Sequence, residues 1–166
     1  MARTRCGLPH RHLILFTRMM PRRLEFMPNE MWQLMNKGNE GASLILVMED
    51  VEETRDGIEK LLQADGYRVD PARNEEDAIR RATLESPDLI LISPGGRGID
   101  VGVTAHRIRK RAELSEAVPV VIFCIETLAE GAEVQIGRNI YVTRPDNFDQ
   151  LRDFLHRLLN AAAATA

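Results

Sequence analysis

Two acidic residues, Glu49 and Asp50, follow the apolar run "LILVM" at 44–48. Adjacent carboxylates repel each other, and a protein tolerates them best where a cation is held between them. A hard divalent ion such as Mg²⁺ suits these oxygen donors. The same pair could instead form a solvated turn before a helix, because acids are favourable at a helix N-terminus. On the pair alone, both interpretations stay open.

A serine follows a second apolar run, "LILI" at 89–92, and precedes Pro94 and two glycines. Ser93 is neutral, so its hydroxyl needs a neighbouring base before it becomes a nucleophile. A hydrolase nucleophile elbow would place glycine two residues before the serine, where Leu91 stands. A phosphate-binding P-loop would need Lys and Ser or Thr after the glycines, and neither follows. Hydrolase chemistry is therefore not favoured.

Two further side chains that could take part in chemistry follow later apolar runs. Cys124 comes directly after "VPVVIF" at 118–123, and Arg144, followed by Pro145, comes after "IYVT" at 140–143. A guanidinium beside a thiol lowers the thiol pKa, so Cys124 could sense oxidants if Arg144 lies near it. The other interpretation is a buried cysteine that packs as a small hydrophobic residue.

Short apolar runs alternate with segments of helical periodicity from Ser43 onward, and Asn74 with Asp77 three residues later predicts the start of one of these helices. The segment "ETLAEGAEVQIG" at 126–137 is predicted as a short, weak helix, which Gly131 interrupts and Gly137 ends. Strands alternating with helices favour a parallel sheet covered on both faces. The predicted strands are 44–48, 67–72, 88–92, 118–123 and 140–143.

The five units predict an α/β fold, a flavodoxin-like doubly wound parallel sheet with strand order 2-1-3-4-5 in a single domain. In such a sheet the carboxyl ends of the strands meet at one edge, where ligands bind. This order is expected to gather the candidate side chains at that edge: Glu49, Asp50, Ser93, Cys124 and Arg144 with Pro145.

The 166-residue chain suffices for one domain with a sizeable core. Residues 1–24 contain many arginines and no acid, so the remainder is more acidic than the net charge of −3 indicates. We predict a basic, disordered extension at 1–41, a folded domain at 42–160 and a disordered tail at 161–166. The acidic domain argues against a nucleic-acid partner, the short apolar runs argue against a membrane span, and the cysteine usage favours the cytoplasm.

Taken in order, several segments resemble the receiver domain of bacterial response regulators over about residues 43–160. They are "LILVMEDVEE" for the first strand and acid pair, "NEEDAIRRA" and "SPDLILI" for the second helix and third strand, and "VPVVIF" for the fourth strand. Asp100 matches an acidic loop position, Tyr141 the switch aromatic, and "RPDNFDQLRDFL" the end of the domain. The resemblance implies a role in two-component phosphorelay signalling.

The chain departs from this family at three positions. Ser93 stands where the family has the aspartate that accepts a phosphoryl group from a histidine kinase. Cys124 stands at the position of a Thr or Ser that contacts the phosphate, and Arg144 at that of a lysine. Losing the aspartate removes an anionic nucleophile and a hard oxygen ligand, so Glu49 and Asp50 would form at most a weak Mg²⁺ site and no cofactor is required.

We hypothesise that the chain is a stand-alone pseudo-receiver, which binds a protein partner without phosphorylation and is not an enzyme. The partner would be a histidine kinase or another signalling protein. The family uses the face of the fourth helix, fifth strand and fifth helix for docking, so a homodimer through that face is a further expectation. The resemblance makes Cys124, Tyr141, Arg144 and Pro145 the switch or phosphate-contact positions.

Two other functions stay open. Ser93 or a neighbouring acid could still accept a phosphoryl group, or the chain could be a small redox or ligand sensor that uses Cys124.

The leading hypothesis also carries a structural expectation. With the third carboxylate gone, Arg144 would pair directly with Glu49 and Asp50 and hold the pocket closed without a metal ion.

Overall fold

The helices and strands follow the predicted alternation over most of the chain. The computed structural model describes residues 41–93, 101–123 and 127–164, so most of the predicted extension at 1–41 lies outside it. The strands are β1 (Leu44–Met48), β2 (Arg68–Ala72), β3 (Leu89–Ile92), β4 (Val120–Phe123), β5 (Ala132–Gly137) and β6 (Ile140–Arg144). The helices are α3 (Glu52–Ala64), α4 (Glu75–Leu84), α5 (Val101–Arg111) and α6 (Phe148–Ala163). Helix α6 thus continues three residues beyond the predicted domain boundary at 160.

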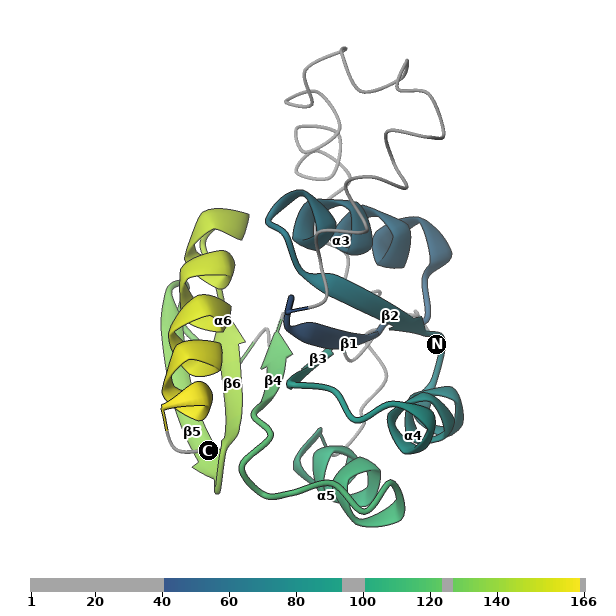
Figure 1. The fold of residues 1–166 in the computed structure, drawn as a ribbon. Coiled ribbons are helices and arrows are strands. Elements are labelled where there is room, and N and C mark those ends of the chain that lie inside the picture. The colour runs from purple at the N-terminus through teal and green to yellow at the C-terminus, as the bar shows by residue number, and fades with distance from the viewer. Residues whose placement is uncertain (1–40, 94–100, 124–126, 165–166) are drawn as a thin grey trace, which may run out of the picture.

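The strands form a single sheet in the order β2-β1-β3-β4-β6-β5 (Figure 1). The first five strands in that order are parallel to one another. The flavodoxin-like fold and the predicted order 2-1-3-4-5 are therefore confirmed, with β6 in the fifth place. The additional strand β5 pairs antiparallel with β6 at the edge of the sheet.

Helices cover both faces of the sheet, and each face has its own apolar core (Figure 1). Ile58 of α3 and Leu155 of α6 pack on one face, and Ile79 of α4 and Ile108 of α5 pack on the other. The residues of β1, β3 and β4 are all buried, as a doubly covered sheet requires. Among the helices that the structure describes, none has the length and apolar character to cross a membrane.

Two asparagine caps and one glycine set helix boundaries in this fold. The side chain of Asn74 accepts the Asp77 N–H at 2.9 Å, which confirms the predicted start of α4. Asn147 caps α6 in the same way by accepting the Gln150 N–H at 2.9 Å. After α3 the chain turns at Gly66 with a φ of 90°, a conformation that glycine adopts without steric cost.

The predicted helix at 126–137 is wrong in the part that the structure describes. Residues 132–137 form β5, and a tight turn at Arg138 and Asn139 connects β5 to β6. Asn139 takes a φ of 51°, and asparagine enters this left-handed region more readily than most residues.

The sequence "AEVQIG" explains why the strand forms. Ala132, Val134 and Ile136 alternate with Glu133 and Gln135, which is the period of two that suits a strand. In a helix, Val134 would lie on the opposite side from Ala132 and Ile136, so the three residues would not form one apolar face. The face predicted from the fourth helix, fifth strand and fifth helix therefore has a strand where the helix was expected.

Candidate functional site

The carboxyl ends of β1 and β3 lie side by side and position two of the predicted site residues. Met48 pairs with Ile92 in the parallel register, so the next residues, Glu49 and Ser93, leave the sheet at the same edge. The Ser93 N–H donates to the Met48 carbonyl at 2.9 Å and fixes this exit. The two buried apolar runs thus deliver an acid and a hydroxyl to adjacent positions.

Glu49 is a buried acid with defined hydrogen-bond partners. Its residue is 3% exposed, and its Oε1 accepts the Val51 N–H at 2.8 Å. The Ser93 side chain also forms a hydrogen bond with the Glu49 carboxylate. The buried Arg55 of α3 donates from its Nη1 to the backbone carbonyl of Glu49 at 3.0 Å. The serine at the predicted acceptor position is therefore engaged with the buried acid.

Burial raises the pKa of Glu49 above its ordinary value of 4.5, because desolvation disfavours the charged carboxylate. The hydrogen bonds from Ser93 and Val51 oppose this rise, and the neighbouring Asp50 adds to it. The net direction is upward. Glu49 therefore holds a proton in the folded protein at pH values where a solvated glutamate has lost it.

We expect Glu49→Gln to stabilise the protein at neutral pH. Because the folded-state pKa is raised, folding binds protons between the ordinary pKa and the raised one, and stability is lost as pH rises through this window. The amide keeps an oxygen for the Val51 N–H but never carries the buried charge. Urea denaturation should give a free energy of unfolding about 1 kcal/mol above wild type at pH 7 and no gain near pH 4.

The control for this change is Glu53→Gln, which alters an exposed glutamate in the first turn of α3. It should produce no stabilisation that grows with pH. An equal gain of Glu49→Gln at pH 4 and pH 7 would contradict the assignment of the effect to a buried, raised carboxyl.

Glu49, Asp50 and Ser93 are the described side chains at this edge that could contact a divalent cation. Asp50 is exposed beside Glu49, and the Glu49 carboxylate already accepts hydrogen bonds from Val51 and Ser93. Within the described ranges, no group of three His, Cys, Asp or Glu side chains is placed to hold a metal ion. Two carboxylates and a hydroxyl would leave about half of the octahedral positions of a Mg²⁺ ion to water.

Arg144 at the end of β6 has contacts in the segment that precedes β5. Its Nη1 donates to the Leu128 carbonyl at 3.0 Å, and its Nη2 lies 3.6 Å from Oε1 of Glu130. These contacts connect β6 to the segment before β5. The predicted pairing of Arg144 with the acids at 49 and 50 stays a prediction, and Pro145 lies half-buried where the chain leaves β6.

Tyr141, the predicted switch aromatic, lies on the α6 side of the sheet. Its ring meets Phe154 edge-on, with centroids 5.6 Å apart and planes at 89°. Its hydroxyl donates to Oδ1 of Asn139, in the turn between β5 and β6, at 3.4 Å. The predicted site residue Cys124 and the loop acid Asp100 lie outside the described residues.

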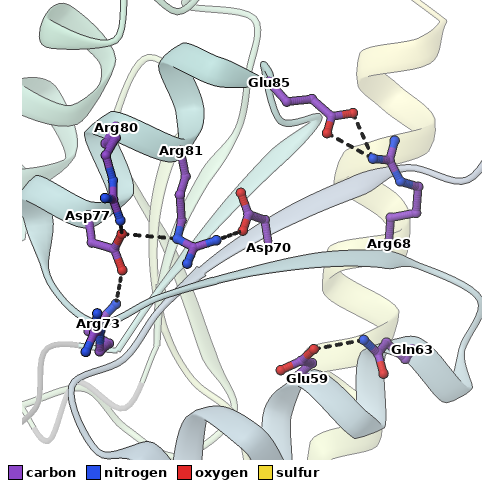
Figure 2. Close-up of polar contacts among 9 residues, drawn as sticks. All are labelled: Glu59, Gln63, Arg68, Asp70, Arg73, Asp77, Arg80, Arg81 and Glu85. Carbon is purple, nitrogen blue, oxygen red and sulfur yellow. Dashed lines mark hydrogen bonds and ion pairs between the residues drawn. The ribbon is translucent and has the colours of Figure 1, made fainter.

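A charge cluster at the end of β2 was not identified from the sequence (Figure 2). The Arg81 guanidinium lies between Asp70 of β2 and Asp77 of α4, and Asp77 also contacts Arg80 at 2.5 Å. Burial opposes ionisation of Asp77, but the Arg73 N–H and the two arginines hold its pKa below the ordinary value. The spacing of Asp77, Arg80 and Arg81 on one helix was the available signal.

A shallow depression of about 290 Å³ borders this cluster. It is lined by Glu52, Arg55, Asp56, Pro71, Arg73, Asp77 and Arg81. Acids and arginines are present in equal number, and Asp77 already forms an ion pair with Arg81. The depression therefore has no evident preference for an anion or a cation.

No family model matches the chain. The chain is 29% identical over 126 residues to the KDP operon transcriptional regulatory protein KdpE of Escherichia coli, a match covering 73% of this chain and 53% of KdpE. It is 25% identical over 122 residues to sporulation initiation phosphotransferase F of Bacillus subtilis, covering 69% of this chain and 92% of that protein. The chain thus spans about half the length of KdpE.

A solved structure extends the comparison to the fold. The response regulator protein TrrA from Thermotoga maritima, in complex with Mg²⁺-BeF, matches with a TM-score of 0.55 and 24% identity. The match covers 70% of this chain and 98% of TrrA. The chain has the flavodoxin-like α/β receiver fold, and its homologues and structural neighbours are response regulator receiver domains.

Proposed function

We propose that this chain is a receiver module of two-component signalling that binds a protein partner without being phosphorylated. The observation that carries the proposal is the pairing of Ser93 with Glu49. The position at which a receiver needs an anionic nucleophile holds a neutral hydroxyl, which is hydrogen-bonded to a buried acid. The partner is a histidine kinase or another signalling protein, in keeping with the relatives that the chain resembles.

The charge balance of the site supports this proposal. Phosphoryl transfer depends on cations that neutralise the charge on the transferred group, and Mg²⁺ usually supplies most of that charge. TrrA holds Mg²⁺-BeF; in this chain, Glu49 and Asp50 are the residues that would hold Mg²⁺. With Ser93 in place of a third carboxylate, the site has one ligand and one negative charge fewer, so its affinity for Mg²⁺ is low.

The same hydrogen bond supports a second candidate function. A hydroxyl that donates to a carboxylate of raised pKa is the arrangement of a nucleophile with its general base. In that case Glu49 would take the Ser93 proton as the hydroxyl oxygen attacks phosphorus. The bond from phosphorus to the donor (the histidine nitrogen of a kinase, or the acetate oxygen of acetyl phosphate) would break, the donor group would leave, and the chain would be a serine-phosphorylated receiver.

Intact-mass spectrometry after incubation with acetyl phosphate and Mg²⁺ separates the two functions. We expect the wild-type mass to stay unchanged, because Ser93 is neutral and the metal site is weak. Ser93→Asp is expected to gain one phosphoryl group, because the substitution restores both the nucleophile and the third carboxylate.

Ser93→Ala is the control for the site of modification. If the wild type gains a phosphoryl group and Ser93→Ala does not, the serine-phosphorylated receiver is correct and our proposal is wrong. If Ser93→Asp remains unmodified, the residue at position 93 is not the reason why the wild type stays unphosphorylated.

A further inference from the structure

The edge strand β5 is an exposed feature of this fold. It pairs with β6 on one side, and β6 separates it from the parallel part of the sheet. Residues 133–136 are exposed, and the large apolar side chains of Val134 and Ile136 are 42% and 48% exposed. The backbone N–H and C=O groups of an edge strand that face away from the sheet can pair with another strand.

The sequence of β5 contains few of the features that protect such an edge. Natural edge strands are blunted by proline, lysine or inward-pointing charges, and "AEVQIG" has no proline or lysine. Its one charge, Glu133, is neutralised by Arg157 of α6, whose Nη2 lies 2.5 Å from the carboxylate. The bulge between Gln135 and Gly137 lies at the end of β5 nearest the turn. The remainder of the strand is regular and carries no net charge.

We propose that two copies of this chain pair through β5, antiparallel and around a twofold axis, to form one continuous sheet. In the register that we propose, Val134 lies opposite Val134 of the second copy. Glu133 then lies opposite Gln135 of the second copy, and Ala132 lies next to Ile136, the residue in the bulge. Opposed residues of antiparallel strands share a face, so the apolar pairs meet on one face and the carboxylate and amide meet on the other.

The strand favours a second copy because it is complementary to itself. A twofold axis requires each residue to match its counterpart, and a shift by one residue would place apolar side chains opposite Glu133 or Gln135. Val134 already lies opposite Val142 of β6, so the apolar pairs would extend the face covered by α4 and α5. The dimer does not depend on the proposed signalling function.

Helix α6 would enlarge the interface. It runs beside β5 and β6 on one face of the sheet (Figure 1), and Arg157 links it to Glu133. The axis would bring the two α6 helices to the same face of the joined sheet. Because one pair of short strands buries less than the roughly 800 Å² per partner of a standard interface, we expect a dimer of moderate affinity.

The first test is the mass of the full chain in solution. Light scattering and sedimentation from about 1 to about 100 µM should give a mass that rises toward twice 18.8 kDa. Val134→Lys should raise the dissociation constant at least about tenfold, because it places two like charges opposite each other on the axis. Val103→Lys is the matched control, since Val103 of α5 is 44% exposed. It should leave the dimer intact.

The second test fixes the register by disulfide cross-linking in a Cys6→Ser, Cys124→Ser background. Directly opposed residues of antiparallel strands have Cα atoms about 4.5–5.5 Å apart, which a disulfide can span. Val134→Cys should therefore cross-link two chains under mild oxidation, and Gln135→Cys should not. A monomeric wild type, an unchanged dimer in Val134→Lys, or cross-linking at position 135 in place of 134 would overturn the proposal.

Discussion

Arg109→Met is expected to lower the free energy of unfolding by about 3 kcal/mol, the sum of partial losses at several carbonyl groups. Arg109 lies near the end of α5 and is 5% exposed. Its guanidinium donates to the carbonyls of Val118, Arg138 and Asn139, at 2.5, 2.6 and 2.7 Å. Methionine fills a similar volume but offers no donor, so the three carbonyls lose the guanidinium, and Asn139 keeps only the Val120 N–H, which donates to its carbonyl at 2.8 Å.

The three carbonyls explain why the effect should be large. One precedes β4 and two form the turn between β5 and β6, so a single side chain of α5 joins three separate segments. Burial lowers the pKa of Arg109, although Glu116 and Tyr141 oppose this shift. The cost of desolvating the guanidinium is thus already incurred in the fold, and the hydrogen bonds offset it.

Urea denaturation of Arg109→Met, Arg109→Lys and Lys110→Met tests this role. Arg109→Lys keeps a charge but lacks the planar fork, so we expect an intermediate loss. Lys110→Met makes a similar change on the adjacent, exposed residue and should stay within about 0.5 kcal/mol of wild type. A loss below about 1 kcal/mol in Arg109→Met would mean that water replaces the guanidinium at these carbonyls.

The sequence predicted the parallel part of the sheet because its signals are local. The runs "LILV", "LILI" and "VVIF" are apolar on both faces, and only a doubly covered strand accommodates such runs. Asn74 with Asp77 three residues later marked the start of α4, and the structure has that cap. These features depend on a few neighbouring residues, so no knowledge of distant contacts was needed.

The segment before β6 was misassigned because two weak local signals conflicted. Glycines at 131 and 137 bound a segment that contains helix-forming residues, and the alternation within it spans only six positions. The structure settles the conflict through distant contacts, which no local pattern reveals. Val134 lies opposite Val142 of β6, and Arg109 of α5 holds the turn at Arg138. A strand can form at this position because β6 is available to pair with it.

The candidate site was predictable in its location but not in its contacts. The strand order places Glu49 and Ser93 at one edge, as expected from the parallel register. The buried Arg55 beneath Glu49 could not be foreseen, because an arginine inside an acidic helix is usually solvated. Its donation to a backbone carbonyl is a contact between a helix face and a strand end, which spacing alone does not encode.

Ser93→Asp is expected to make the stability of the protein depend on Mg²⁺. Without metal, the new carboxylate lies beside the buried Glu49 and removes the hydroxyl that donates to it. Repulsion and the lost donor should lower the free energy of unfolding by about 2 kcal/mol. Three carboxylates at one edge then form a better site for a hard divalent cation than the two present in the wild type.

Mg²⁺ should reverse this loss. An ion that binds only the folded state stabilises it by about 2.7 kcal/mol when the concentration of free ion is one hundred times the dissociation constant. Thermal denaturation with millimolar Mg²⁺ or EDTA measures the effect. Ser93→Asn has the size of aspartate without its charge. It should therefore lose less stability than Ser93→Asp in EDTA and should not be stabilised by Mg²⁺. The wild type should respond by less than about 0.5 kcal/mol, since its site lacks the third carboxylate. Equal stabilisation of wild type and Ser93→Asp would mean that Glu49 and Asp50 suffice to bind the ion. The prediction that the wild type binds Mg²⁺ weakly would then be wrong.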